Sequence, residues 1–115
     1  MTLAITPKSA TNKLLIEIVV HLAHNSTGSR LVAALFQDAT AAALAVGWGS
    51  KDATVNATSK VVFRHYMTTG TTSATTFKIR AGTSTGGTTT FNGVNGGRLY
   101  GGVLASSITI TEIIV

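Results

Sequence analysis

The sequence predicts an all-β fold, an antiparallel β-sandwich of the jelly-roll type with about eight short strands. Short apolar stretches recur at a spacing of about 8–12 residues, and clusters of Gly, Thr and Ser separate them. Apolar and polar side chains alternate within several of these stretches, which is the period of a strand and not of a helix. Eight short antiparallel strands in one domain fit a jelly roll.

Residues 13–23 form the clearest expected strand. Its even-numbered positions are all apolar from Leu14 to Leu22, which predicts that this face lies in the core. The odd-numbered positions are only half apolar. A subunit on its own would leave Leu15 and Val19 of this second face in contact with water.

The other expected strands are shorter or less regular. Residues 30–37 are apolar on both faces, which predicts a strand without a solvent face. The Ala-rich stretch 39–46 favours a helix by propensity, but it is short and leads into Gly47-Trp48-Gly49, so we expect a strand. Further strands are expected at residues 2–6, 60–67, 75–81, 88–92, 99–104 and 107–115.

Composition restricts the class of protein. The chain of 115 residues fits one domain, residues 1–115, and the absence of cysteine excludes disulfides and thiolate metal sites. The formal charge of +5 comes from nine scattered basic residues and only four acids, without a basic run, so nucleic-acid binding is not expected. No apolar run approaches the roughly 20 residues that a membrane span requires.

The low charge also bears on assembly. Only 11% of the residues are charged and 44% are hydrophobic, so Thr, Ser, Asn and Gly must cover much of the surface. Such a surface suits a subunit that copies of itself partly cover. Homo-oligomerisation is therefore the first hypothesis.

Three stretches resemble the C-terminal domain of bacteriophage tail-fibre and other virion structural proteins. They are residues 98–113 (RLYGGVLASSITITEI), 5–17 (ITPKSATNKLLIE) and 69–78 (TGTTSATTFK). The resemblance implies a jelly roll similar to the trimeric complement and tumour-necrosis-factor folds. It further implies that this domain is the C-terminal part of a longer fibre-type protein, that Met1 is an internal boundary, and that the location is the surface of the phage particle. It supplies no catalytic residues.

Candidate catalytic residues are few. His65, Asp38, Asp52 and several serines could supply a Ser-His-Asp triad, but there is no Gly-x-Ser-x-Gly motif. His65 alternates with Phe63 and Met67 on an apolar face, which favours a histidine buried in the core or in an interface. We therefore expect no enzymatic activity and no cofactor.

Metal binding within one chain is not expected either. His21 and His24 are three residues apart, which places them on opposite faces of a strand. A histidine close to a threefold axis could still share an ion with its symmetry copies. This remains a hypothesis about the assembly.

The resemblance implies a homotrimeric fibre-tip knob, and we expect such a knob to bind host cell-surface polysaccharide through loops 25–29, 49–59 and 83–97, with weak sites strengthened by avidity. The alternative is a capsid-decorating or fibre-trimerisation module that contacts other virion proteins and has no receptor. The expected trimer interface consists of Leu15, Val19, Val32, Phe36 and Tyr100. The expected saccharide contacts are Asn25, Trp48, Asn56, Thr85, Asn92 and Asn95.

Overall fold

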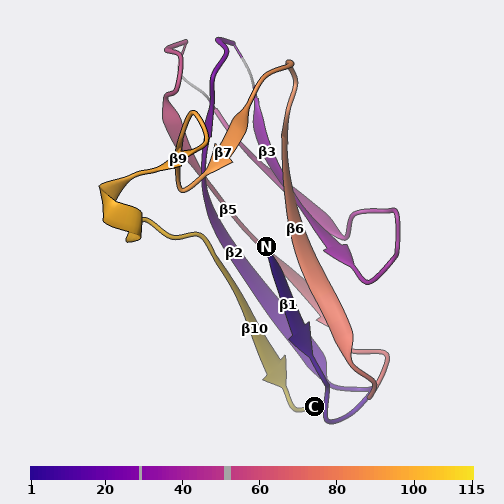
Figure 1. The fold of residues 1–115 in the computed structure, drawn as a ribbon. Coiled ribbons are helices and arrows are strands. Elements are labelled where there is room, and N and C mark those ends of the chain that lie inside the picture. Colours follow the sequence, from indigo (N-terminus) through magenta and orange to yellow (C-terminus); the bar gives the residue numbers. More distant parts are fainter. Residues whose placement is uncertain (29, 51–52) are drawn as a thin grey trace.

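The computed structural model describes residues 1–28, 30–50 and 53–115, which fold into two antiparallel β-sheets packed face to face (Figure 1). Ser29, Lys51 and Asp52 lie outside the described residues. Two of the expected contact loops are therefore described only in part, and Asp52, one of the acids considered for a triad, lies outside the described residues. The all-β, antiparallel β-sandwich expected from the sequence is confirmed.

Eight strands of the described chain form the two main sheets. Sheet A has the order β1 (Thr2–Ile5), β6 (Thr75–Thr83), β3 (Leu31–Gln37) and β4 (Ala45–Gly49). Sheet B has the order β10 (Ser107–Ile113), β2 (Lys13–His24) and β5 (Thr58–Thr68), and β7 (Thr89–Phe91) pairs with the end of β2 beyond β10. Successive strands mostly cross between the sheets, as in a jelly roll. The exceptions are the β3–β4 hairpin and the pair β7 and β10, which both join β2.

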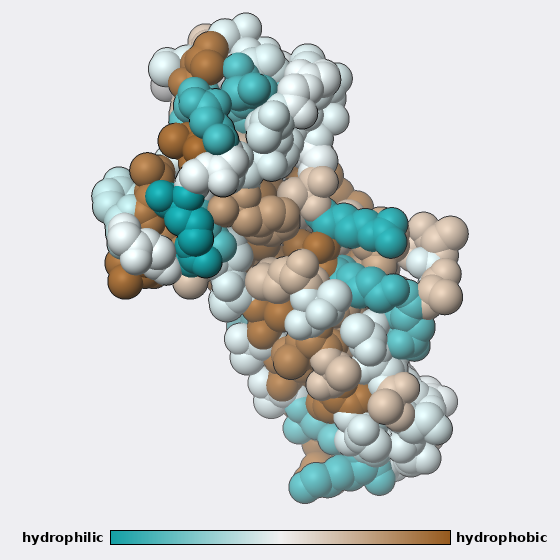
Figure 2. Space-filling model, in the orientation of Figure 1, coloured by the Kyte–Doolittle hydropathy of each residue, from teal (hydrophilic) through white to brown (hydrophobic). Residues whose placement is uncertain are grey.

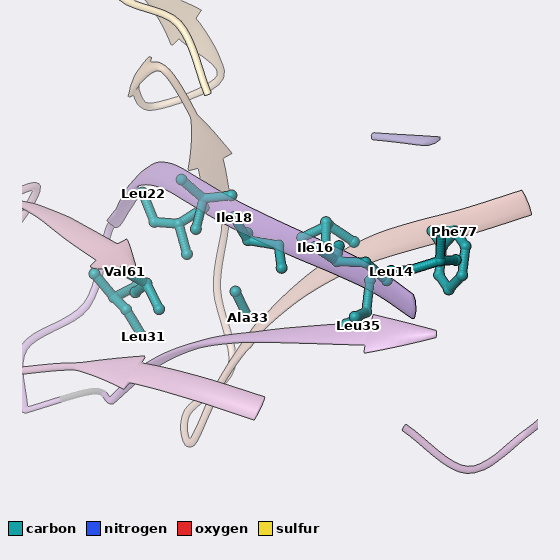
Figure 3. Close-up of a cluster of buried hydrophobic side chains, with 11 residues drawn as sticks. Leu14, Ile16, Ile18, Leu22, Leu31, Ala33, Leu35, Val61 and Phe77 are labelled. Carbon is teal, nitrogen blue, oxygen red and sulfur yellow. The ribbon is translucent and has the colours of Figure 1, made fainter. Parts of the chain in front are cut away.

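The core lies between the sheets and is organised by β2. Its even-numbered side chains from Leu14 to Leu22 are at most 1% exposed, as the alternation predicted. They pack against Leu31, Leu35 and Phe77 of sheet A (Figure 3). The odd-numbered side chains of β2 therefore point to the outer face of sheet B.

One side of the sandwich is closed by β4 of sheet A, which contacts β5 of sheet B. This close approach requires glycine, because a Cβ added at Gly47 would lie 2.5 Å from a ring carbon of Phe63. A Cβ added at Gly49 would lie 2.6 Å from the Ser59 hydroxyl. The two glycines that flank Trp48 thus face inward, and the Trp48 side chain points to solvent.

The expected strand at residues 39–46 is wrong. The structure has a loop at 38–44 and begins β4 only at Ala45. Asp38 ends β3 with a positive φ of 49° and accepts hydrogen bonds from the Thr75 hydroxyl and the Thr76 amide. These bonds hold the turn, and the alanines form the loop that projects from the sandwich between β3 and β4 (Figure 1).

The expected strand at residues 99–104 is also wrong. Residues 93–106 form an arm that carries the short hairpin β8 (Gly93–Val94) and β9 (Gly97–Arg98) and the 3₁₀ turn η1 (Tyr100–Gly102), and it projects beyond sheet B (Figure 1). Tyr100, Gly101 and Gly102 all have positive φ, which a strand does not allow. The Arg98 guanidinium closes the turn by donating to the carbonyls of Gly102 and Leu104.

The other side of the sandwich is less well covered. Its edge strands are β1, which is only four residues long, and β10, and β10 ends its pairing with β2 at Val19. Figure 2 shows hydrophobic side chains along the middle of the molecule, between β10 and β6. Leu3 is 37% exposed there, and Ile108, Ile110 and Phe91 are partly buried against the core.

Candidate functional site

The outer face of sheet B carries a group of apolar side chains on two paired strands. Leu15 of β2 lies opposite Tyr66 of β5, and Val19 lies opposite Val62. Val62 and Tyr66 are 60% and 56% exposed, whereas Leu15 and Val19 are half-buried. We call these four residues the sheet B patch.

Tyr100 is placed by the arm on the same side of the molecule. A hollow of about 290 Å³ lies between the arm and sheet B, and Tyr100 lines it together with His21 and Lys60. His21 of β2 and Lys60 of β5 are cross-strand partners, and both point to the outer face of sheet B. Tyr100 is 74% exposed and Val103 is 81% exposed, so the tip of the arm is apolar. The structure thus brings Leu15, Val19 and Tyr100 to one side.

Val32 and Phe36, the other two expected interface residues, lie on the opposite side of the sandwich. Both point outward from β3 in sheet A and are half-buried. Val32 is flanked by Trp48 of β4, and Phe36 is flanked by Lys78 of β6. The five expected residues therefore do not form one continuous surface.

The outer face of sheet A combines aromatic and cationic side chains. The Arg30 guanidinium carbon lies 5.8 Å from the centroid of the Trp48 ring, and that of Arg80 lies 5.0 Å from the centroid of the Phe36 ring. Trp48 is 63% exposed. A groove of about 420 Å³ runs along its side and is lined by Arg30, Val32, Val46 and Trp48.

Three of the expected saccharide contacts lie close to His24 at one end of the sandwich, namely Asn25, Asn56 and Thr85. His24 is buried, with Nδ1 3.0 Å from the Thr89 hydroxyl and Nε2 3.2 Å from the Gly86 carbonyl. Since a carbonyl only accepts, Nε2 donates in this contact. The Thr85 hydroxyl lies 3.5 Å from Nε2 and 2.9 Å from that of Ser26. The sequence signal for this organising role is the even-numbered position of His24, which places it on the core face of β2.

Two of the asparagines of these loops accept hydrogen bonds that hold the loops in place, whereas the buried carboxamide oxygen of Asn56 has no partner among the described residues. The Asn25 carboxamide oxygen accepts from the Thr88 amide at 2.8 Å, and that of Asn92 accepts from the Ser106 hydroxyl at 2.7 Å. Asn56, Asn92 and Asn95 all have positive φ, a conformation that asparagine tolerates better than most residues. Asn56 is half-buried, so Asn95 is the most open of these side chains apart from Asn25.

Two carboxylates tie down the opposite end of the sandwich. Glu112 Oε1 accepts from Asn12 Nδ2 at 2.7 Å and from the Lys8 amide at 2.8 Å. The hydrogen bond from Asn12 lowers the pKa of Glu112. The hydrogen bond from the Thr76 amide, helped by that from the Thr75 hydroxyl, lowers the pKa of Asp38. Both groups anchor strand ends in the structure.

The remaining titratable residues are dispersed. His65 points inward from β5 and is half-buried, while His21 and His24 lie on opposite faces of β2, as expected. In the described parts of the chain, no group of three or more His, Cys, Asp or Glu side chains is placed to hold a metal ion. The same residues include no helix long and apolar enough to cross a membrane.

No protein-family model matches this sequence, and no curated protein matches it either.

Proposed function

We propose that this chain is a structural module that assembles as a homotrimer, as at the tip of a phage fibre, and that its outer surface recognises the host. The observation that carries the proposal is the sheet B patch. Val62 and Tyr66 each expose more than half of their side-chain surface directly beside Leu15 and Val19. These two outward-facing apolar pairs lie on either side of the Glu17–Arg64 pair, and so many exposed apolar side chains on regular strands favour a protein contact over solvent.

A cyclic trimer needs two different surfaces on each subunit, because its contacts are heterologous. The sheet B patch is one such surface. The tip of the arm, with Tyr100 and Val103, and the open side of the sandwich beside Leu3 are apolar surfaces that could receive it. Burial of apolar surface contributes roughly 25 cal/mol per Å², so such contacts would make the assembled subunit more stable than the isolated one.

Sheet A is the less suitable contact face, although Val32 and Phe36 lie there. Arg30, Lys78 and Arg80 belong to or border this face, and none of its four strands contains an acidic residue. Burying these cations in a subunit contact would cost desolvation, and the strands of this face offer no acid of their own to pair with them. We therefore place the trimer contacts on the side of sheet B.

Sedimentation velocity of the wild-type chain and of two matched variants tests this proposal. Val62→Lys and Val46→Lys place the same charge at residues that are 60% and 57% exposed, each on an edge strand. We expect the wild type and Val46→Lys to sediment as trimers and Val62→Lys to sediment as a monomer.

A wild-type chain that is monomeric and folded at micromolar concentration would contradict the trimer. Dissociation of Val46→Lys but not of Val62→Lys would move the contacts to sheet A. Circular dichroism of each variant, recorded at the same concentration, separates dissociation from unfolding.

A further inference from the structure

We infer that the outer face of sheet A is a binding site for a carboxylated saccharide, seated in the groove beside Trp48. This inference rests on the proposed host recognition and names the class of ligand. It requires of the proposed trimer only that sheet A is not covered by another subunit. It moves the recognition surface from the loops to a sheet face. Trp48 is the one expected saccharide contact that lies on this face.

The groove offers two kinds of contact side by side. Trp48, Val32 and Val46 provide an apolar wall on which the C–H face of a sugar ring can pack. Arg30 lines the same groove and has its guanidinium beside the Trp48 ring. A guanidinium presents N–H donors in a planar fork that matches a carboxylate, so a uronic or sialic acid would satisfy both halves of the site.

The middle of the face is low enough to extend the site toward a second cation. Ala34 lies between Arg80 and Val46 across the sheet, and Gly82 lies next to Val32. These small residues place little side-chain bulk between Trp48 and Arg80, whose guanidinium lies over Phe36. Figure 2 shows hydrophilic side chains reaching out on this side of the molecule, where β6 runs.

The charges on this face favour an anionic ligand. Asp38 directly follows β3 of this face, but its carboxylate already accepts hydrogen bonds from the Thr75 hydroxyl and the Thr76 amide. The Asp38 carbonyl accepts from the Lys78 ammonium. Within the described residues, the guanidinium groups of Arg30 and Arg80 contact aromatic rings but have no carboxylate partner. A carboxylate group of the ligand would provide this missing partner.

Single-stranded nucleic acid fits the face less well. Such proteins stack successive bases on several open rings along a basic groove. Among the described residues, this face carries two aromatic rings, Trp48 and Phe36, with an arginine over each, and the chain carries no basic run. An acidic saccharide needs one ring and one or two guanidinium groups.

Trp48 is the only tryptophan of the chain, so its fluorescence reports on this groove alone. The probe is an oligogalacturonate, and the matched control ligand is the same oligosaccharide with its carboxylates methyl-esterified. We expect saturable quenching or a spectral shift with the acid and none with the ester. Arg30→Gln should weaken binding about tenfold or more, since it removes a charge-assisted contact. Lys60→Gln, the same loss of charge on sheet B, should leave the affinity unchanged.

Equal titration curves for the acid and its ester would overturn the inference, as would tighter binding of a thymidine oligonucleotide. Trp48→Ala removes the aromatic part of the apolar wall. Isothermal titration calorimetry of this variant should therefore detect no heat of binding. The Val62→Lys variant separates this site from the assembly. If this variant is monomeric and still binds the oligogalacturonate, the site lies within one subunit. If the wild type sediments as a monomer and binds the oligogalacturonate, only the trimer is refuted.

Discussion

The two outer faces of the sandwich differ although their inner faces are alike. Both inner faces consist mainly of Leu, Ile, Val, Ala and Phe and meet in one core. Outside, sheet B presents the apolar pairs Leu15–Tyr66 and Val19–Val62, whereas sheet A presents Trp48 and Phe36, each beside an arginine. Period-two alternation decides which side chains face inward, but it leaves each outer face free to specialise. We assign assembly to one face and recognition to the other.

Alternate residues of β2 test the division between inside and outside most strongly. Ile16→Ala removes a fully buried side chain and should lower the free energy of unfolding by about 2–5 kcal/mol. Leu15→Ala, its neighbour on the outer face, should cost less in stability but weaken the trimer. Urea denaturation and sedimentation at one protein concentration give both quantities. Equal losses of stability would mean that Leu15 is part of the core.

The close approach of β4 to β5 can be broken by one methyl group. Gly47→Ala places a Cβ against Phe63 and should destabilise the fold by about 1–3 kcal/mol. It should also shift the emission of Trp48, because β4 must move outward. Gly82→Ala is the control, since a Cβ there meets no atom within 4 Å. Similar melting temperatures for the two variants would show that β4 is not tightly held.

The arginine over Phe36 should contribute a smaller amount. Arg80→Gln removes the cation and is expected to lower stability by about 0.5–1 kcal/mol, as at other exposed cation–aromatic pairs. Arg64→Gln makes the same change on the outer face of sheet B, where no aromatic ring pairs with it in the described structure, and should have a lesser effect. Thermal unfolding at low and high salt measures both. An Arg64 variant that is the less stable would reverse the comparison.

Acid should weaken both sheets through one carboxylate each. Hydrogen bonds lower the pKa of Asp38, directly after β3 of sheet A, and of Glu112 in sheet B. Their stabilisation is complete above the ordinary carboxyl pKa values and is lost as the pH falls through the lowered ones, so melting temperatures should decline below about pH 4. Asp38→Asn and Glu112→Gln should each flatten part of this decline. An unchanged profile in both variants would exclude these groups as its source.

Alternation was sufficient to predict the long strands and the core. The even-numbered positions of β2 and the inward residues of β5 and β6 follow from residue type alone, because a half-buried sheet imposes a period of two. In β3 both faces are apolar, so residue type did not show which face is inward, and the expectation of a strand without a solvent face was wrong: Val32 and Phe36 lie on the outer face of sheet A. The alanines before Trp48 carry no such pattern. Their loop depends on how Asp38 bonds to Thr75 and Thr76, which lie 37 and 38 residues away, so local propensity could not predict it.

The candidate sites were predicted only in part for the same reason. Trp48 was singled out by its flanking glycines, but the reason for these glycines, the close approach of Gly47 to Phe63 and of Gly49 to Ser59, depends on strand packing. Arg30 and Arg80 were seen as scattered charges, because their positions beside aromatic rings require the register between β3, β4 and β6. The arm failed as a strand because Tyr100 adopts positive φ, which its residue type does not favour.

The central position of β2 has a consequence for how the chain folds. Its partners include β10, and the Lys8 amide before it bonds to Glu112, 104 residues later. Closing so large a loop costs entropy before any contact repays it, so folding should be slow for a domain of this size. Until β10 docks, β2 keeps an open hydrogen-bonding edge over its first seven residues, and nascent chains could join through that edge. Refolding yield should therefore fall as protein concentration rises.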